Sequence, residues 1–386
     1  RPERSRGLED EVLKGLPSRR SGPVRPGRAA GPGKTPFPRP APVRPGRRSK
    51  RGGSRGLQQG SSRPEGPVVR VRAYAKVNLH LRIGHRRPDG YHEIDSIMHR
   101  ISWGDDLELR WRPDGAIHLE VEVEGGGPPG AGGRSPGLPG SIPSGPDNLA
   151  WQAARLLQES FAVRAGVAIR LTKRVAAGAG LGGGSADAAA VLRGLRRLWR
   201  VDVDGATLRR LAQDLGADIP FLLGGRAARV RGKGERIEPL PPWPGLPLVL
   251  VPLPQAVSTA WAYGEWDRRR AAGGIAGGGG GRGVPEPEAG GGEEAGSGQA
   301  VARAVAQRDL AALARLAWND FEPVVATAVP QVTAALAALR REGAVVARMS
   351  GSGPVVWGIF PNEEAARRAW GRLRAAYPAA RMVRTL

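Results

Sequence analysis

Residues 178–185 read Gly-Ala-Gly-Leu-Gly-Gly-Gly-Ser. Five glycines within seven positions let the backbone approach a polyanion closely and turn its N–H groups toward it. The stretch follows an apolar strand pattern at 167–171 and precedes an amphipathic helical pattern from about Ser185 to Trp199. A helix N-terminus carries about half a positive elementary charge, so this placement favours a phosphate-binding loop over a flexible linker. The loop does not match a Walker A motif, because no Gly-Lys-Ser/Thr follows it.

The sequence on either side of this loop alternates between strand and helix patterns. The pattern predicts strands at 68–74, 76–83, 107–111 and 116–123, with a Pro-Asp-Gly turn at 88–90. It predicts helices that begin near Asp147 or Asn148 and at 205–215. Beyond them we expect a strand at 246–251, helices at 259–269, 299–317 and 330–342, and a final strand, turn, strand, helix and strand over 345–386. This order predicts a mixed antiparallel α+β fold with two lobes.

Composition and charge divide the chain further. Residues 1–66 hold 17 Lys+Arg and 5 Asp+Glu, a net charge of +12, whereas the other 320 residues carry a net charge of +11. We interpret residues 1–66 as a disordered basic Arg/Pro/Gly-rich extension. Residues 67–240 are then the first lobe, and residues 241–386 the second, with a Gly-rich insertion near 271–300 that holds 13 glycines.

Cysteine and long apolar runs are absent from the sequence. Without cysteine there are no disulfides, thiolate metal sites or cysteine nucleophiles, which suits the cytoplasm. The longest apolar run is too short to span a membrane, and the basic N-terminus lacks the apolar segment of a secretory signal. We therefore expect a cytoplasmic protein without a membrane partner.

Two charged residues stand in apolar surroundings. Only 6 of the 59 basic residues are lysines, and Lys76 is one of them, within an apolar strand pattern. The choice of lysine suggests a need for a compact ammonium group, although a solvated strand lysine explains it equally well. Asp218 lies in Gly-Ala-Asp-Ile-Pro just after a predicted helix, where it is either a functional carboxylate or a helix C-cap or Asx turn.

Two further features leave their roles open. Ser350-Gly351-Ser352-Gly353 lies between two predicted strands as either a plain hairpin or a second phosphate-facing loop. All five histidines fall between residues 80 and 118, and no pair has the i, i+4 spacing of a helical metal site. We interpret most of them as ordinary polar residues, with His92, which follows the Pro-Asp-Gly-Tyr turn, as the exception.

Taken together and in this order, the Lys76 strand, the glycine loop, the Gly-Ala-Asp-Ile-Pro segment and the late Ser-Gly-Ser-Gly resemble the GHMP kinases. Within that superfamily, Ala-Lys-Val-Asn-Leu at 75–79 and Pro-Asp-Gly-Tyr-His at 88–92 resemble the 4-diphosphocytidyl-2-C-methyl-D-erythritol kinases of isoprenoid precursor biosynthesis. The resemblance covers roughly residues 67–386 apart from the two Gly-rich loops. It implies a ribosomal-protein-like α/β N-terminal lobe, a ferredoxin-like C-terminal lobe, and ATP in the cleft between them.

The resemblance also implies roles for individual residues. Lys76 and Asp218 would be the catalytic pair, with Asp218 accepting the proton of the substrate hydroxyl. Asn78, Tyr91, His92 and Tyr263 would bind a small-molecule cytidine diphosphate substrate, the two tyrosines as aromatic faces for cytosine and His92 at the edge of the base. The loop that holds the ATP phosphates would comprise Ala176, Ala177, Gly178, Ala179, Gly180, Leu181, Gly182, Gly183, Gly184, Ser185 and Ala186.

The loop departs from the family pattern at two positions. Ala176 stands where the family usually has proline, and Ala186 where a second serine is common. The retained Ser185 can cap the helix or reach a metal-bound phosphate. We therefore expect Mg²⁺ to be held mainly through ATP, with Ser185 as a candidate contact and no direct protein metal site.

Two rival interpretations remain open. Another GHMP kinase, for homoserine or mevalonate, shares the loop but not the Pro-Asp-Gly-Tyr-His segment. From a different class, an RNA-binding protein would use the basic residues 1–66, and would leave the glycine loop and Asp218 without a role. We expect contact with nucleic acid only as a nonspecific property of the basic extension.

Overall fold

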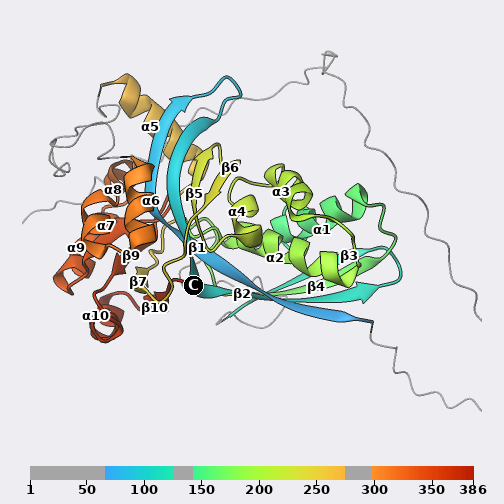
Figure 1. Cartoon of the computed structure of the whole chain (residues 1–386). Helices are drawn as coiled ribbons and strands as arrows, with labels where there is room; N and C mark the ends of the chain where they lie inside the picture. Colours follow the sequence, from blue (N-terminus) through green and yellow to red (C-terminus); the bar gives the residue numbers. More distant parts are fainter. Residues whose placement is uncertain (1–65, 125–141, 274–296) are drawn as a thin grey trace, which may run out of the picture. The chain divides into compact units, whose positions relative to one another are not determined.

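Two long antiparallel strands, β1 (Val68–Arg86) and β2 (His92–Arg112), form the hairpin on which the described chain is built. In the computed structural model, which describes residues 66–124, 142–273 and 297–386, this hairpin curves between two groups of helices (Figure 1). The predicted turn at 88–90 is confirmed, because one strand ends just before it and the other begins just after it. The two strands expected at 68–74 and 76–83 are a single strand.

Irregular pairing explains why β1 did not read as one strand. The register against β2 shifts between Tyr74 and Lys76 and again between Asn78 and His80. Each shift moves the following side chains relative to the two faces of the sheet. Residues 75–81 are all buried, so no exposed face is left to mark a period of two. The shifts lie next to Lys76 and Asn78, and they set the direction in which these side chains point.

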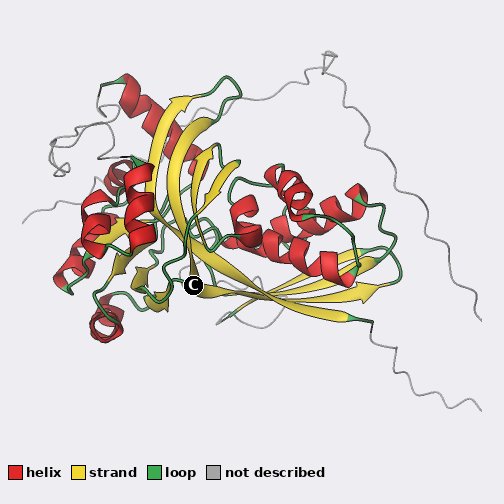
Figure 2. Cartoon of the chain, viewed as in Figure 1, coloured by secondary structure: helices red, strands yellow, loops and turns green. Residues whose placement is uncertain are grey.

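The first sheet has six strands in the order β3-β4-β2-β5-β6, with β1 paired to β2. Strand β2 is long enough to pair with β4 near its end and with β5 near its start. Helices α1 to α4 cover one face of this sheet (Figure 2). The other elements of this lobe are β3 (Ile117–Val123), α1 (Leu149–Ser160), β4 (Gly166–Lys173), α2 (Gly183–Leu198), α3 (Gly205–Gln213), α4 (Ile219–Gly224), β5 (Ala227–Gly232) and β6 (Arg236–Pro239).

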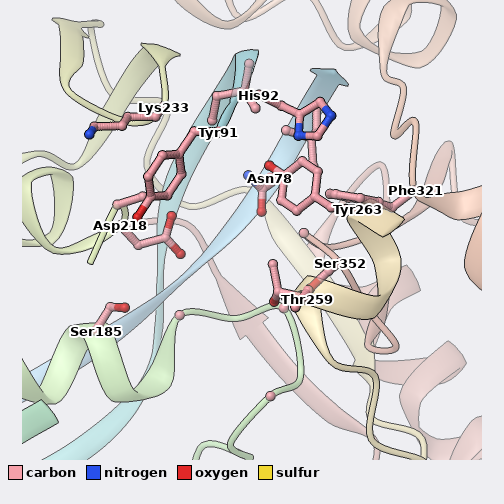
Figure 3. A pocket seen from close by; sticks show the side chains of 18 of the residues that line it. Asn78, Tyr91, His92, Ser185, Asp218, Lys233, Thr259, Tyr263, Phe321 and Ser352 are labelled. Carbon is pink, nitrogen blue, oxygen red and sulfur yellow. Dashed lines mark hydrogen bonds between the residues drawn. The ribbon is translucent and has the colours of Figure 1, made fainter. Parts of the chain in front are cut away.

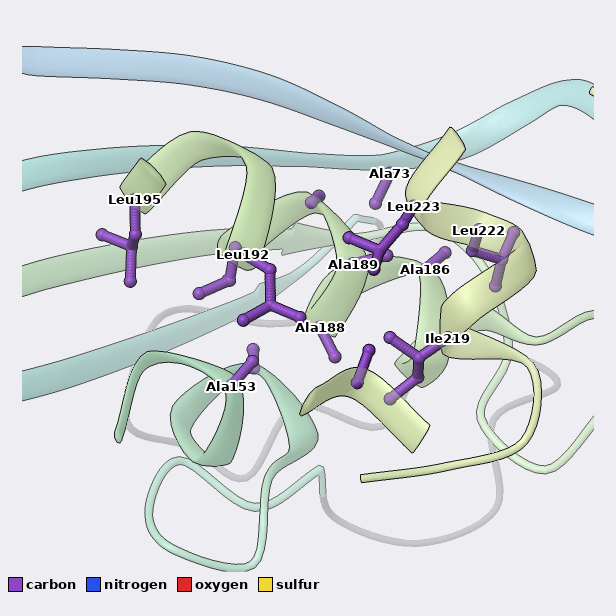
Figure 4. Close-up of a cluster of buried hydrophobic side chains, with 14 of the residues drawn as sticks. Ala73, Ala153, Ala186, Ala188, Ala189, Leu192, Leu195, Ile219, Leu222 and Leu223 are labelled. Atoms are coloured by element: carbon purple, nitrogen blue, oxygen red, sulfur yellow. The ribbon is translucent and has the colours of Figure 1, made fainter. Parts of the chain in front are cut away.

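Helix α2 packs closely in the first core because many of its buried residues are small. Ala186, Ala188 and Ala189 pack among leucines and isoleucines of the neighbouring elements (Figure 4). A Cβ atom at Gly194 would lie 2.3 Å from Leu109 Cδ1, so a larger residue would require the buried Leu109 side chain to move. The close packing fixes the start of α2 against the sheet.

The second sheet pairs its strands antiparallel in the order β10-β7-β9-β8. In chain order these are the fourth, first, third and second strands, with helices after the first and the third, which is the expected ferredoxin-like arrangement. The two-lobed α+β fold is thus confirmed. The elements are β7 (Pro247–Val251), α5 (Thr259–Ala271), α6 (Gly298–Gln307), α7 (Leu310–Leu316), α8 (Glu322–Ala328), α9 (Gln331–Arg341), β8 (Val346–Met349), β9 (Val356–Ile359), α10 (Glu363–Ala376) and β10 (Arg381–Arg384).

A third core cluster joins the two lobes. Val77 and Leu79 of the long hairpin pack with Leu248, Trp357 and Ile359 of the second sheet. The middle of the hairpin is therefore buried on both sides. Its polar residues are held in place by both lobes.

The predicted secondary structure missed several short elements and also the first part of β2, of which only residues 107–111 were predicted. Helices α4 and α8 and strands β5 and β6 were not predicted, because four to seven residues show too few periods for a pattern. The single helix expected at 299–317 is two helices, because Arg308 takes a left-handed conformation with φ 57°. Most of residues 1–66 and of the Gly-rich insertion near 271–300 lie outside the described residues.

Within the described ranges, no single helix is long and apolar enough to cross a bilayer. Helices α8 and α9, bent by 116° relative to each other, reach the length and apolar composition of a membrane span only when the two are counted together.

Candidate active site

A cavity of about 890 Å³ collects most of the predicted site residues. Six predicted side chains line it together with the glycine loop (Figure 3). Three members of the predicted loop do not line it: the side chains of Ala176, Leu181 and Ala186 are buried in the core. The predicted residues that line it are Lys76, Asn78, Tyr91, His92, Asp218, Tyr263 and the segments 177–180 and 182–185.

The glycine loop takes conformations that require glycine. Gly178, Gly180 and Gly182 have φ of 67°, 77° and 67°, in the left-handed region that L side chains rarely adopt. At Gly180 a Cβ atom would also lie 1.9 Å from the backbone oxygen of Ser350. The loop therefore packs tightly against the turn after β8, and glycine at position 180 permits the close contact between the two backbones.

The N-terminus of α2 opens onto the cavity. Its N-cap residue is Gly182, no side chain caps it, and its first turn contains no acidic residue. Gly183, Gly184 and Ser185 of that turn line the cavity. The first N–H groups of a helix have no partner within the helix, so this end offers donors and a partial positive charge to an anion.

Lys76 points its ammonium group at three acceptors. Its Nζ donates to Asn78 Oδ1 at 2.6 Å and to the backbone oxygen of Gly180 at 3.1 Å, and lies 3.3 Å from Asp218 Oδ2. An ammonium group has three hydrogens and can satisfy three separate acceptors, whereas a planar guanidinium would not fit this arrangement. Lys76 is buried, which removes the solvated-lysine alternative.

Asp218 precedes a helix as well as following one. It stands immediately before α4, in a helical conformation, and its side chain makes no capping hydrogen bond. The C-cap alternative is wrong because Asp214 is the C-cap of α3, and the Asx-turn alternative is wrong because the Asp218 side chain makes no such hydrogen bond. One quarter of the side chain is exposed, toward the cavity. The carboxylate can thus meet both Lys76 and a bound molecule.

The Ser-Gly-Ser-Gly segment connects β8 to β9 and also supports the site. Ser350 Oγ donates to the backbone oxygen of Gly180 at 2.8 Å and accepts from the backbone N–H of Asn78 at 3.3 Å. Gly351 and Ser352 line the cavity, and Ser352 Oγ lies 2.9 Å from Thr259 Oγ1. The segment is a turn between paired strands that holds the glycine loop to β1.

Aromatic side chains occupy the other end of the cavity. Tyr91 is 58% exposed, and the ammonium of Lys233 lies 4.7 Å from its ring centroid. Tyr263 stacks on His92 with centroids 4.8 Å apart and ring planes 14° apart. Burial, together with the charge of Asp218, raises the pKa of Tyr263 to about 12, so its phenol stays neutral at physiological pH. Figure 3 shows Tyr91 and Tyr263 on different sides of the cavity.

Several cavity residues were missed at the level of sequence. Lys233, Thr259, Asp267 and Phe321 all line the cavity. A signal for Lys233 was present, because residues 67–386 contain only three lysines among 42 basic residues. The rarity of lysine, which helped to single out Lys76, applies to Lys233 as well, but Lys233 lacks the apolar strand pattern. The others carried no local signal.

A buried charged cluster lies behind the glycine loop. Lys173 Nζ is 2.5 Å from Asp105 Oδ2 and 2.8 Å from Asp187 Oδ2, and all three side chains are buried. Asp105 also accepts from the backbone N–H of Val175 at 2.8 Å. Burial raises the pKa of Asp187 to about 8. The cluster ties the start of α2 to β2 and to the end of β4, and so fixes both ends of the loop.

The chain resembles known proteins over both lobes. Residues 148–226 match the N-terminal domain of the GHMP kinases, and residues 301–379 match their C-terminal domain. The 4-diphosphocytidyl-2-C-methyl-D-erythritol kinase of Pelotomaculum thermopropionicum is 39% identical over 307 residues, which span 80% of this chain and 94% of that protein.

Solved structures agree with this relationship. A crystal structure of 4-(cytidine 5'-diphospho)-2C-methyl-D-erythritol kinase has a TM-score of 0.58 at 32% identity, covering 82% of this chain and 99% of that one. A homoserine kinase from Cytophaga hutchinsonii has the same TM-score at 17% identity, covering 86% of this chain and 97% of its own, and shows the shared fold alone. The chain belongs to the 4-diphosphocytidyl-2-C-methyl-D-erythritol kinase family of the GHMP kinases.

Proposed function

We propose that this chain transfers the γ-phosphoryl group of ATP to the 2-hydroxyl group of 4-diphosphocytidyl-2-C-methyl-D-erythritol, with Lys76 and Asp218 as the catalytic pair. The observation that carries the proposal is the placement of the Lys76–Asp218 ion pair, at 3.3 Å, in the same cavity as the open N-terminus of α2. A phosphate held at that helix end lies beside a carboxylate that can accept a proton.

The chemistry assigns one task to each side chain. Asp218 takes the proton of the substrate hydroxyl as its oxygen bonds to the γ-phosphorus, while the bond from that phosphorus to the β–γ bridging oxygen breaks and ADP leaves. Lys76 keeps the carboxylate oriented and stabilises the negative charge that develops on the transferred group. Asn78 accepts from Lys76 and donates through Nδ2 to Ser96 Oγ at 2.8 Å, which fixes the ammonium in place.

The remaining predicted residues divide between nucleotide and substrate. Residues 177–185 would hold the ATP phosphates through backbone N–H groups. Tyr91 offers a broadly exposed aromatic ring to the cytosine base. One face of Tyr263 is covered by His92, so Tyr263 would contact the base together with that histidine rather than alone.

The residues present suit a magnesium ion that arrives with the nucleotide. No group of three or more His, Asp or Glu side chains in the described ranges is arranged to hold a metal. Ser185 and Asp218 bring hard oxygen donors to the cavity, the ligand type that Mg²⁺ prefers. When bound with ATP, the ion supplies charge neutralisation for the phosphates.

A coupled assay of ADP release tests the proposal. We expect turnover with 4-diphosphocytidyl-2-C-methyl-D-erythritol and none above background with homoserine or mevalonate. The nearly isosteric variant Asp218→Asn should fold and bind ATP like the wild type, while its kcat falls by roughly 10²- to 10⁴-fold. Turnover of the variant within about threefold of wild type would remove Asp218 from the mechanism, and preference for homoserine would refute the substrate.

A further inference from the structure

A second charged pair lies in the cavity, away from the phosphoryl-transfer pair. His92 Nε2 lies 2.7 Å from Asp267 Oδ1. His92 is the first residue of β2 in the N-terminal lobe, and Asp267 is on α5 in the C-terminal lobe. Both line the cavity, the histidine side chain 6% exposed and the aspartate 40% exposed. The proposed phosphoryl transfer does not use this hydrogen bond between the two lobes.

The histidine ring is fixed in two ways by one helix. Tyr263 stacks on it and sets the plane of the ring, and Tyr263 is itself held by Phe321 at 4.9 Å in an edge-on contact. Asp267, four residues further along α5, lies on the same face of the helix and bonds to the edge of the ring. The ring therefore cannot turn over about its own plane without losing the bond to Asp267.

The hydrogen bond to Asp267 also determines which ring nitrogen of His92 carries hydrogen. An ionised carboxylate only accepts hydrogen bonds, so Nε2 must carry hydrogen. In the neutral imidazole Nδ1 is then an acceptor, and it has no hydrogen-bond partner within the described residues. Fixing one nitrogen of a histidine thus decides what the other can recognise, as in metal sites where a carboxylate orients a ligating histidine.

We infer that Asp267 is a positioning residue that holds His92 in the Nε2–H form, so that its Nδ1 accepts from the exocyclic amino group of cytosine and selects cytidine over uridine substrates. The inference rests on the proposed function. Cytosine has an amino group, a hydrogen-bond donor, where uracil has a carbonyl oxygen, an acceptor. With uracil, two acceptors, the carbonyl oxygen and Nδ1, would face each other with no hydrogen between them. A site built around a buried polar group discriminates strongly against a substrate that leaves the group unpaired.

The test compares the cytidine substrate with its uridine analogue at pH 8. We expect Asp267→Ala to lower the ratio of kcat/KM values, cytidine over uridine, by at least about tenfold, chiefly through KM for the cytidine substrate, with KM for ATP unchanged. Asp267→Asn keeps the volume and an oxygen that can accept from Nε2, and should restore most of the ratio. Glu342→Ala is the matched control: it removes an ion-paired carboxylate, 3.0 Å from Arg372, that does not line the cavity.

Two further measurements separate positioning from mere stability. In the double variant Asp267→Ala with His92→Ala, the ratio should be no lower than in His92→Ala alone, because Asp267 acts through the histidine. Nitrogen-15 NMR should show hydrogen on Nε2 of His92 in the wild type and a mixture of tautomers in Asp267→Ala.

The outcomes distinguish the inference from the proposed function. If the wild type phosphorylates the cytidine substrate and Asp267→Ala keeps the wild-type ratio, the inference is wrong and the proposed function stands. A wild-type His92 with hydrogen only on Nδ1 would also overturn the inference. Failure of the wild type to use the cytidine substrate would refute both.

Discussion

Gly180 gives the sharpest test of how the glycine loop is held. In Gly180→Ala the new methyl group would lie 1.9 Å from the backbone oxygen of Ser350 in a residue with φ 77°. The left-handed conformation alone costs roughly 1–2 kcal/mol for an L residue. The clash must also move the loop away from Ser350, and the oxygen of Gly180 accepts from both Lys76 Nζ and Ser350 Oγ.

The lost hydrogen bonds set the size of the effect. A neutral hydrogen bond contributes about 0.5–1.5 kcal/mol and one from a charged donor about 1.5–3 kcal/mol. With the backbone cost, Gly180→Ala should lower the free energy of unfolding by about 3–6 kcal/mol. Gly178→Ala is the matched control, since Gly178 has a φ of 67° and no atom within 4 Å of the position that the new methyl group would take. It should lose only about 1–2 kcal/mol.

Urea unfolding of the two variants and the wild type, followed by circular dichroism, measures both values. Calorimetric titration with ATP shows in addition whether the displaced loop in Gly180→Ala still binds nucleotide; we expect weaker binding. Equal losses of stability in the two variants would refute the reasoning, because the backbone conformation would then account for the whole effect and the contact with Ser350 for none of it.

Three further changes probe other parts of the molecule. Tyr91→Ala should raise KM for the cytidine substrate by about 5- to 150-fold, from roughly 1–3 kcal/mol of stacking, with KM for ATP unchanged; a parallel rise in both would contradict it. Burial lowers the pKa of His80 to about 4, so the unfolded chain binds its proton first and stability is lost, by up to about 3 kcal/mol, as pH falls from 6.5 to 4. His80→Asn should flatten this part of the stability profile in urea unfolding. Asp187, with a raised pKa of about 8, keeps a proton that the unfolded chain releases, so stability falls as pH rises from about 4 to 8, by at most about 1.4 kcal/mol per pH unit. Asp187→Asn should remove that slope, and an unchanged slope would refute the assignment.

Local sequence patterns predicted much of the fold and part of the site. The strand, glycine loop and helix around residues 178–185 were predicted because each has a strong local cause: alternation, backbone freedom and amphipathic spacing. Asp147 and Asn148 were the two candidate caps of a helix, and Asn148 is the cap, since its Oδ1 accepts from the N–H of Ala150 at 2.9 Å. Short elements such as α4 lacked enough residues to show a period, so the helix after Asp218 went unseen.

The partners of individual side chains could not be predicted from local sequence. Lys76 was an ambiguous strand lysine until the fold placed Asp218 and the oxygen of Gly180 around its ammonium. His92 and Asp267 are 175 residues apart and meet only because α5 of the second lobe lies against the start of β2. Neither residue carries a local mark of this contact.

The sequence by itself determined the two-lobed α+β class and the position of the glycine loop between a strand and a helix, because backbone freedom and periodicity act over a few neighbouring residues. Only the tertiary structure decided which of these residues meet. The register shifts beside Lys76 and Asn78 change the direction of the strand, and the core shared by the two lobes brings the cavity residues of both lobes together. These contacts join residues far apart in the chain, and their geometry depends on packing that no single segment contains.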